Sequence, residues 1–308
     1  MFDTVRAHLV ERYDVEVVVS SFHSVGVLPR VKAVLEARRH QGDVTHVVGD
    51  VHYLTLLLHR PSTVLTVHDA EFLTRAGGLK AQLYVWWWLR LPVRRAALVT
   101  VPSEASRAEL LRLVRCDPAT VRVVVNPVAE RFVPTPAPEH RRPVVLLMGC
   151  WPNKNLQRSA AALQGLDVDV VLVGQPSAEQ LRALDSLSIV VRERLSDAEV
   201  VQAYRHCDLL LFPSTSEGFG VPVLEAQASA RPVVTSDRRP MSDVAGGAAC
   251  LVDPLDVDSI RAGVQRVLAD HVYREQLVRG GLDNVARYQP PAVAAAYAAI
   301  YDEVLARS

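Results

Sequence analysis

The sequence predicts an α/β protein built from two doubly wound parallel sheets. Short runs of β-branched and other apolar residues alternate with longer segments of helical periodicity over most of the 308 residues. Near-continuous apolar strands separated by helices are typical of parallel sheets covered on both faces. A proline-rich segment, residues 133–143, separates the strands into two series and favours an extended connector. We therefore expect two α/β domains joined by this segment.

The N-terminal series, over residues 1–136, opens unusually. Residues 1–12 have Phe2, Val5 and Leu9 on one helical face and are predicted to form a helix, followed by a strand at 15–20. A doubly wound domain normally opens with a strand and a tight turn that leads into its first helix. The N-terminal domain is therefore expected to lack its usual first strand. Its further strands are expected at 45–48, 63–67, 98–101 and 121–125.

The second series predicts a C-terminal domain over residues 137–288. Its strands are expected at 144–148, 168–173, 189–191, 209–212, 233–235 and 250–252. A last segment, residues 289–308, starts with two prolines and has its larger apolar side chains at helical spacing. It is predicted to be an amphipathic helix whose apolar face needs a partner surface.

Composition excludes several function classes. The 34 basic and 34 acidic residues balance, and the difference between the two halves is too small to favour nucleic-acid binding. The four cysteines lie far apart without a Cys-x-x-Cys pair, which argues against a zinc site or a disulfide framework. The most hydrophobic stretch, residues 83–102, is broken by Arg90, Pro92 and Arg94, so it does not read as a membrane span. No export signal is evident, and a cytoplasmic location is expected.

Residues 209–237 carry the most informative pattern. A buried strand is expected to end at Phe212, and a loop containing Gly218 and Gly220 leads into a helix with Pro222 in its first turn. Glycines let the backbone come close to a ligand, and amides at a helix N-terminus favour an anion. Glu225 falls on an otherwise apolar helix, where an unpaired carboxylate is costly. Two adjacent sugar hydroxyls would give it hydrogen-bond donors.

These residues resemble the retaining nucleotide-sugar glycosyltransferases of family 4, the glycosyl transferases of group 1, which have the GT-B fold. The signature is the pair Glu217 and Glu225 around Gly-Phe-Gly-Val-Pro. A second match is the loop Met-Gly-Cys-Trp-Pro-Asn-Lys-Asn at 148–155, and a third is Thr-Val-His-Asp at 66–69. The resemblance extends over almost the whole chain from about residue 43. It implies two Rossmann-like domains that face a cleft, with residues 289–308 packed back on the N-terminal domain.

The resemblance also implies roles for single residues. Glu225 corresponds to the carboxylate that binds the ribose hydroxyls, and Lys154 to the lysine that holds the donor diphosphate. Glu217 corresponds to the residue that binds the transferred sugar, and His68 corresponds to the histidine that contacts that sugar. The implied catalytic residues are therefore His68, Lys154 and Glu217. The implied donor-binding residues are Gly149, Asn153, Lys154, Gly218, Phe219, Gly220, Val221 and Glu225.

The implied reaction moves a sugar from a GDP- or UDP-linked donor, for example of mannose type, to a glycan, lipid-linked or small-molecule acceptor. It retains the anomeric configuration and uses no metal or other cofactor; polysaccharide biosynthesis is the expected setting. Two departures from the family pattern stand out: Asn153 precedes Lys154 where relatives often carry an arginine nearby, and Asp243 replaces a glutamate. Lys154 as a solvated loop lysine and His68 as a structural histidine remain alternatives, and Glu217 and Glu225 could instead cap a helix.

Two alternative functions remain. One is a nucleotide-sugar epimerase of the same fold, against which the loop from Glu217 to Glu225 argues. The other is a non-catalytic nucleotide-sugar-binding scaffold, which the missing first strand would favour. Product analysis with the donor alone distinguishes the first, and binding without turnover would support the second. A dehydrogenase is disfavoured because no strand–Gly-x-Gly-x-x-Gly–helix unit is present.

Three consecutive tryptophans, Trp86, Trp87 and Trp88, are followed by Arg90, Arg94 and Arg95. Tryptophan and arginine favour the headgroup region of a membrane, so this stretch suggests peripheral contact at the inner face. Three consecutive residues cannot share one helical face, so at least one tryptophan is predicted to lie in the core.

Overall fold

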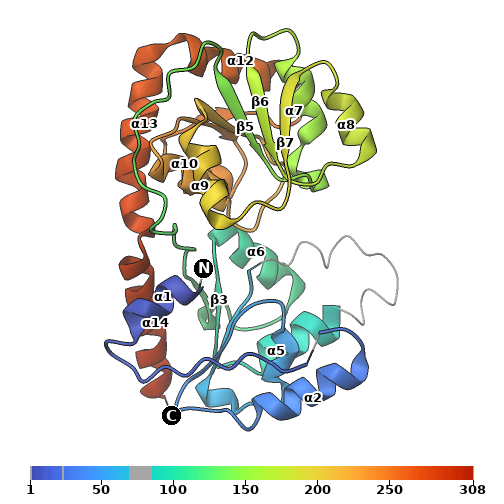
Figure 1. Cartoon of the computed structure of the whole chain (residues 1–308). Helices are drawn as coiled ribbons and strands as arrows, with labels where there is room; N and C mark the ends of the chain where they lie inside the picture. The colour runs from blue at the N-terminus through green and yellow to red at the C-terminus, as the bar shows by residue number, and fades with distance from the viewer. Residues whose placement is uncertain (1, 23, 69–84, 308) are drawn as a thin grey trace. The chain divides into compact units, whose positions relative to one another are not determined.

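The computed structural model describes residues 2–22, 24–68 and 85–307. Its contacts divide the chain into two compact units, which Figure 1 shows. The first unit comprises Met1–Pro127 together with Pro290–Ser308, and the second comprises Val128–Gln289. The division thus falls before the proline-rich segment and not after residue 136. Residues 135 and 136 belong with the second unit because the buried Arg231 of that unit donates hydrogen bonds to both of their carbonyl oxygens.

The first unit contains a parallel sheet of four strands in the order β1-β2-β3-β4 among the described residues. Their bounds are β1 Thr45–Val47, β2 Thr63–Thr66, β3 Leu98–Val101 and β4 Val121–Val123. The two central strands are buried along their whole length, as expected for a parallel sheet covered on both faces. The predicted strands at these four places are therefore confirmed, each to within two residues.

The predicted strand at 15–20 is wrong. These residues form no strand, although the run is rich in valine. Val17 and Val19 are 53% and 82% exposed, so the β-branched side chains have no sheet face to pack against. β propensity reflects packing on a half-buried pleated surface, and that surface is missing here. The helix predicted before this run is present as α1, Phe2–Leu9.

The helical segments of the first unit connect and cover its strands. Their bounds are α2 Val27–Ala37, 3-10 turns His52–Leu57, Arg60–Ser62 and Pro118–Thr120, the π-helical turn Trp86–Arg90, α5 Leu91–Arg94, α6 Glu104–Leu113 and the C-terminal α14 Pro290–Leu305. In the π-helical turn Trp88 is only 4% exposed, whereas Trp86 and Trp87 are each 45% exposed. The prediction that one tryptophan lies in the core is confirmed.

Helix α14 packs on α1 and on the sheet of the first unit (Figure 1). Its side chains Val293, Tyr297, Ile300 and Val304 share one apolar cluster with Val5 of α1 and with strand residues. His46 makes two polar contacts beside this cluster. Its Nδ1 lies 2.7 Å from the Tyr301 hydroxyl oxygen, and its Nε2 lies 2.7 Å from the Thr66 hydroxyl oxygen. Burial lowers the pKa of His46 to about 3, so the ring remains neutral near pH 7.

The second unit contains a six-stranded parallel sheet in the order β10-β9-β8-β5-β6-β7. Its strands are β5 Val144–Met148, β6 Asp169–Val173, β7 Ser188–Arg192, β8 Leu209–Phe212, β9 Val233–Ser236 and β10 Cys250–Val252. The chain runs outward from β5 to β7, then returns to place β8 on the other side of β5. Ligands in open α/β sheets bind beyond the carboxyl ends of the strands at such a reversal. The topology therefore directs attention to the loops after β5 and β8.

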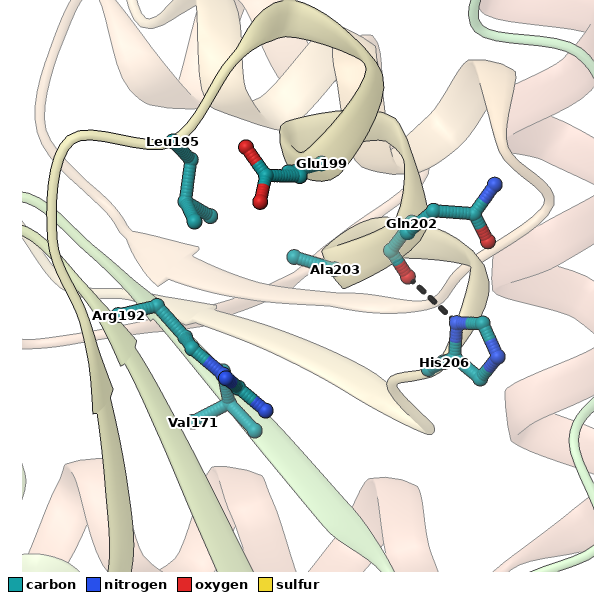
Figure 2. A pocket seen from close by; sticks show the side chains of 7 residues that line it. All are labelled: Val171, Arg192, Leu195, Glu199, Gln202, Ala203 and His206. Atoms are coloured by element: carbon teal, nitrogen blue, oxygen red, sulfur yellow. Dashed lines mark hydrogen bonds between the residues drawn. The ribbon is translucent and has the colours of Figure 1, made fainter.

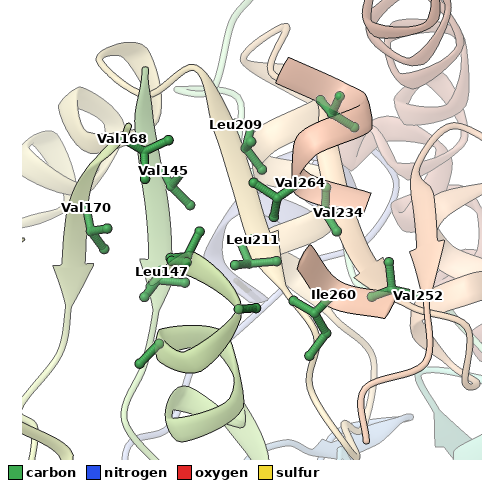
Figure 3. Close-up of a cluster of buried hydrophobic side chains, with 14 of the residues drawn as sticks. Val145, Leu147, Val168, Val170, Leu209, Leu211, Val234, Val252, Ile260 and Val264 are labelled. Atoms are coloured by element: carbon green, nitrogen blue, oxygen red, sulfur yellow. The ribbon is translucent and has the colours of Figure 1, made fainter. Parts of the chain in front are cut away.

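The core of this unit contains side chains from both of those strands, which pair with each other in the sheet. Val145 and Leu147 of β5 and Leu209 and Leu211 of β8 point to the same face, as Figure 3 shows. Helices α7 and α12 cover that face. The helices of the unit are α7 Leu156–Leu163, α8 Ala178–Leu184, α9 Asp197–Arg205, α10 Val221–Ala228, α11 Met241–Ala245, α12 Val257–Ala269 and α13 His271–Val285, with 3-10 turns at Pro152–Lys154 and Ala286–Tyr288. Alternate side chains of a strand point to opposite faces of the sheet, so each central strand is buried on both faces.

Candidate active site

The loops that follow β5 and β8 are joined at the strand reversal. Asn153 lies in the first loop, and its carbonyl oxygen accepts a hydrogen bond from the Thr215 amide of the second loop at 2.9 Å. The side chain of Asn153 donates to the carbonyl oxygen of Ser216, also at 2.9 Å. These bonds hold the two predicted donor-binding loops against each other, although about 60 residues separate them in the sequence.

Gly149 and Lys154 fit together in the first loop. Gly149 has a φ of +84°, a conformation that side chains rarely tolerate. A Cβ atom there would also lie 3.1 Å from Cε and 3.2 Å from Cγ of Lys154. The lysine stem therefore lies across the glycine backbone, and its Nζ is 4.7 Å from the centre of the Phe212 ring at the end of β8. Glycine is needed at 149 so that the ammonium group can reach the second loop.

Glu217 receives that ammonium group. Lys154 Nζ lies 2.6 Å from Glu217 Oε1, and the two side chains are only 17% and 13% exposed. Asn153 Nδ2 donates to the same oxygen at 3.2 Å. Three residues that the sequence assigned to the donor site, Asn153, Lys154 and Glu217, thus form one cluster.

Asn155 has a structural role that the sequence analysis did not assign. It is 5% exposed and sits at φ +59° directly before α7. Its Nδ2 donates to the carbonyl oxygens of Pro213 and Pro254, so it links the loops after β5, β8 and β10. Asparagine adopts this left-handed conformation more readily than most residues, which is the sequence signal that could have identified it.

The glycine loop ends at the N-terminus of α10. Gly220 precedes the helix with a φ of +103°, and Pro222 occupies the first turn. Phe219 is 4% exposed and packs edge-on against Tyr288, with ring centres 5.9 Å apart. This packing anchors the loop, while the helix N-terminus that follows provides partial positive charge for an anion.

Glu225, in the second turn of α10, has a protein partner that the sequence did not reveal. The fully buried Tyr204 of α9 donates its hydroxyl to Glu225 Oε2 at 2.7 Å. Burial raises the pKa of Glu225, and the hydrogen bond from Tyr204 opposes that rise. Arg131 also lowers the pKa of this carboxyl group, and Asp197 raises it. Tyr204 thus holds the carboxyl group of Glu225 through one of its two oxygens, Oε2.

Arg231 fixes the end of α9 from which Tyr204 projects. It is 2% exposed, and its guanidinium donates to the carbonyl oxygens of Tyr204 at 3.0 Å and Arg205 at 2.8 Å. Further bonds reach Thr135 and Pro136. A guanidinium group can satisfy several acceptors in a fixed fork, which an ammonium group cannot. The position of Tyr204 therefore depends on Arg231.

His68 lies in the first unit, two residues after β2. It is half-buried, and its Nδ1 is buried without a hydrogen bond to any residue that the structure describes. Burial lowers its pKa, and the nearby Asp50 opposes that shift. The imidazole is thus neutral near pH 7. Asp69, the next residue of the predicted motif, lies outside the described residues.

A separate groove of about 440 Å³ lies between the β6–β7 edge and α9 (Figure 2). None of the predicted donor residues lines it. The lining residues are Val171, Arg192, Leu195, Glu199, Gln202, Ala203 and His206.

Across residues 2–22, 24–68 and 85–307, no group of three His, Cys, Asp or Glu side chains is arranged to hold a metal ion. Over the same ranges, no helix is long and apolar enough to cross a membrane.

Comparison with known proteins assigns the family. The sequence model described as "Glycosyltransferase Family 4" matches residues 3–132, and the one described as "Glycosyl transferases group 1" matches residues 142–270. Each model covers one of the two α/β regions, and together they cover most of the chain.

Two of the relatives that match this chain are mannosyltransferases. The chain is 28% identical over 218 residues to the O-antigen chain mannosyltransferase B of Escherichia coli, an alignment that covers 63% of this chain and 57% of the relative. It is 34% identical over 148 residues to the phosphatidyl-myo-inositol mannosyltransferase of Mycobacterium tuberculosis, covering 45% of this chain and 39% of the relative. The alignments therefore span only about two-fifths to three-fifths of these relatives.

The fold has solved counterparts. The Anabaena protein Alr3699/HepE, solved in complex with UDP-glucose, matches with a TM-score of 0.74 and 17% identity, covering 89% of this chain and 82% of that protein. At this identity the likeness concerns the fold, and with the two parallel sheets it confirms the GT-B prediction. The chain belongs to family 4 of the glycosyltransferases, the glycosyl transferases of group 1, and has their GT-B fold.

Proposed function

We propose that this protein transfers a hexose from a GDP- or UDP-linked sugar to a glycan, lipid-linked or small-molecule acceptor. The observation that carries the proposal is the cluster of Asn153, Lys154 and Glu217 at the strand reversal, next to the N-terminus of α10. A cation, a carboxylate and helix amides at one place suit a ligand that combines a diphosphate with sugar hydroxyls.

The nucleotide end of the donor is assigned to Glu225. Its Oε2 accepts from Tyr204, so its other oxygen is oriented and can accept from the ribose hydroxyls. The diphosphate is assigned to Lys154 and to the backbone of Gly149 and Asn153, and the transferred sugar to Glu217 and the backbone from Gly218 to Val221, including Phe219 and Gly220. These assignments follow the family signature and agree with the hydrogen-bond geometry.

In the proposed reaction the bond between the anomeric carbon and the diphosphate oxygen breaks, and the oxygen keeps the electron pair. The acceptor hydroxyl oxygen bonds to the anomeric carbon, and its proton passes to the departing diphosphate oxygen. The Lys154 ammonium and the α10 N-terminus would stabilise the charge that develops on the diphosphate, without a metal ion. His68, which is neutral because burial lowers its pKa, is proposed to hydrogen-bond the transferred sugar. Retention of configuration is proposed from the family resemblance.

We also propose peripheral contact with an anionic membrane surface, at the cytoplasmic face. Trp86 and Trp87 are each 45% exposed, and Arg90 and Arg94 are exposed on the following turns. One relative is named phosphatidyl-myo-inositol mannosyltransferase, and this lipid name supports a lipid-linked substrate here. Replacing both exposed tryptophans with serine should reduce co-sedimentation with phosphatidylglycerol vesicles; unchanged binding would contradict this contact.

Product analysis tests the proposed reaction. The full chain is incubated with UDP-glucose or GDP-mannose, with and without a panel of glycan, lipid-linked and small-molecule acceptors, and the products are identified by mass spectrometry. Acceptor-dependent glycoside formation, lost in Lys154→Met, is the expected result. Conversion of the donor to an isomer without an acceptor would indicate an epimerase, and binding without turnover would indicate a scaffold.

A further inference from the structure

In the structure Lys154 and Glu217 neutralise each other. Their charged atoms are 2.6 Å apart, and both side chains are largely buried. A diphosphate that recruits Lys154 must therefore compete with Glu217 for the same ammonium group. Because partly buried charges interact strongly and are costly to leave unpaired, the fate of Glu217 after this exchange affects which ligand binds well.

The hydrogen bonds indicate which partner stays in place. Asn153 donates to Glu217 Oε1 and to the Ser216 carbonyl, and its own carbonyl accepts from Thr215, so the carboxylate remains tied to both loops without Lys154. The lysine, by contrast, lies on a flexible four-carbon stem across Gly149. Lys154 is therefore the group that can swing to a phosphate, and Glu217 is the group left behind.

We propose that Glu217 makes the site discriminate between a nucleotide sugar and the free nucleoside diphosphate. This inference rests on the proposed function, since it takes Lys154 as the diphosphate ligand. A nucleotide sugar brings hydroxyl groups that donate to the carboxylate once Lys154 has left it. The free diphosphate brings no such hydroxyls at that position. It leaves Glu217 with the hydrogen bond from Asn153 but without its cationic partner, facing the negative charge of the phosphate.

The two ligands also differ in charge. The terminal phosphate of a nucleoside diphosphate loses a second proton with a pKa of about 6, so near pH 7 it carries roughly one more negative charge than the sugar-substituted form. Glu217 repels that additional charge. Both effects disfavour the diphosphate relative to the sugar nucleotide, which would assist release of the product after transfer.

Calorimetry on the full chain tests the inference with two ligand pairs, UDP with UDP-glucose and GDP with GDP-mannose. One of these pairs is expected to bind the wild-type protein. We expect Glu217→Gln to bind the diphosphate of that pair several-fold more tightly than the wild type does. The ratio of the diphosphate Kd to the sugar-nucleotide Kd should fall by about tenfold, equivalent to ~1.4 kcal/mol. Glu275 lies on α13, and its side chain is 68% exposed. The control Glu275→Gln removes the same charge there and should leave the ratio unchanged.

A change of both dissociation constants by one common factor, or no change in either, would overturn the inference. Glu217→Ala provides a second charge-free variant if the glutamine protein melts below the wild type. In Lys154→Met the further change Glu217→Gln should tighten diphosphate binding less than it does in the wild type, because the Lys154–Glu217 ion pair is absent and only the charge repulsion remains. Undiminished tightening would also overturn the proposal. If neither ligand pair binds the wild-type protein, the proposed function itself fails, which is a distinguishable result.

Discussion

At the scale of single residues, the candidate site depends on groups that orient the ligand-binding side chains. Tyr204 holds one oxygen of Glu225, and Arg231 holds the backbone from which Tyr204 projects. Neither tyrosine nor arginine would touch the sugar that is transferred. They are positioning residues, and their effect should be visible in the pH dependence of binding.

Tyr204→Phe tests this role. Its hydroxyl lowers the pKa of Glu225, and burial raises it, so removing the hydroxyl raises the pKa further. Ribose binding by the ionised carboxylate is lost as pH falls through that pKa, and in the variant the loss should begin at a higher pH. The lost hydrogen bond to a charged group should also weaken diphosphate binding near pH 7 by about tenfold, or ~1.5 kcal/mol. Titrations from about pH 5 to 8 measure both effects.

A matched control for this variant is Tyr273→Phe, on α13 away from the candidate site. It should bind the diphosphate as the wild type does at each pH. If Tyr204→Phe and the wild type give the same pH midpoint, Tyr204 does not control the ionisation of Glu225.

At the scale of elements, α14 is the part of the first unit that comes from the far end of the sequence. Ile300 is 6% exposed in the apolar cluster that α14 shares with α1, whereas Leu305 on the same helix is 40% exposed. Ile300→Ala should destabilise the first unit by about 2–4 kcal/mol, and Leu305→Ala by less than ~1 kcal/mol. Thermal unfolding followed by circular dichroism measures the difference; equal shifts would show that α14 is not packed as described.

The strands show what a sequence can predict at this scale. Buried strands such as β2, β3 and β8 were predicted to within one or two residues because their apolar runs need burial on both faces. The valine run at 15–20 has the same local composition but no strand partner, and a single sequence does not reveal whether a sheet edge is available to it.

The site was predictable in a similar, partial way. The family signature identified Lys154 and Glu217 from their loops and Glu225 from the helix that follows. The contact between Tyr204 and Glu225 was not predictable, because it depends on how α9 packs beside α10. The ion pair between Lys154 and Glu217 joins loops after two different strands, so it required the order of strands in the sheet as well as the motifs.

At the scale of the whole molecule, the chain consists of two α/β units, and the predicted donor contacts are concentrated in the second. Lys154, Glu217 and Glu225 all belong to Val128–Gln289, whereas His68 belongs to the first unit. Nucleotide binding should therefore depend mainly on the second unit, and sugar transfer should additionally require His68.

The most direct test of the central claim is nucleotide binding by the full chain and by Glu225→Ala. UDP or GDP at one hundred times its dissociation constant should stabilise the wild-type protein by about 2.7 kcal/mol, seen as a higher melting temperature. Glu225→Ala should fold but lose most of that increase, because the ribose hydroxyls lose their acceptor. An equal increase in both proteins, or none in the wild type with either nucleotide, would contradict the assignment of this site to a nucleotide-sugar donor.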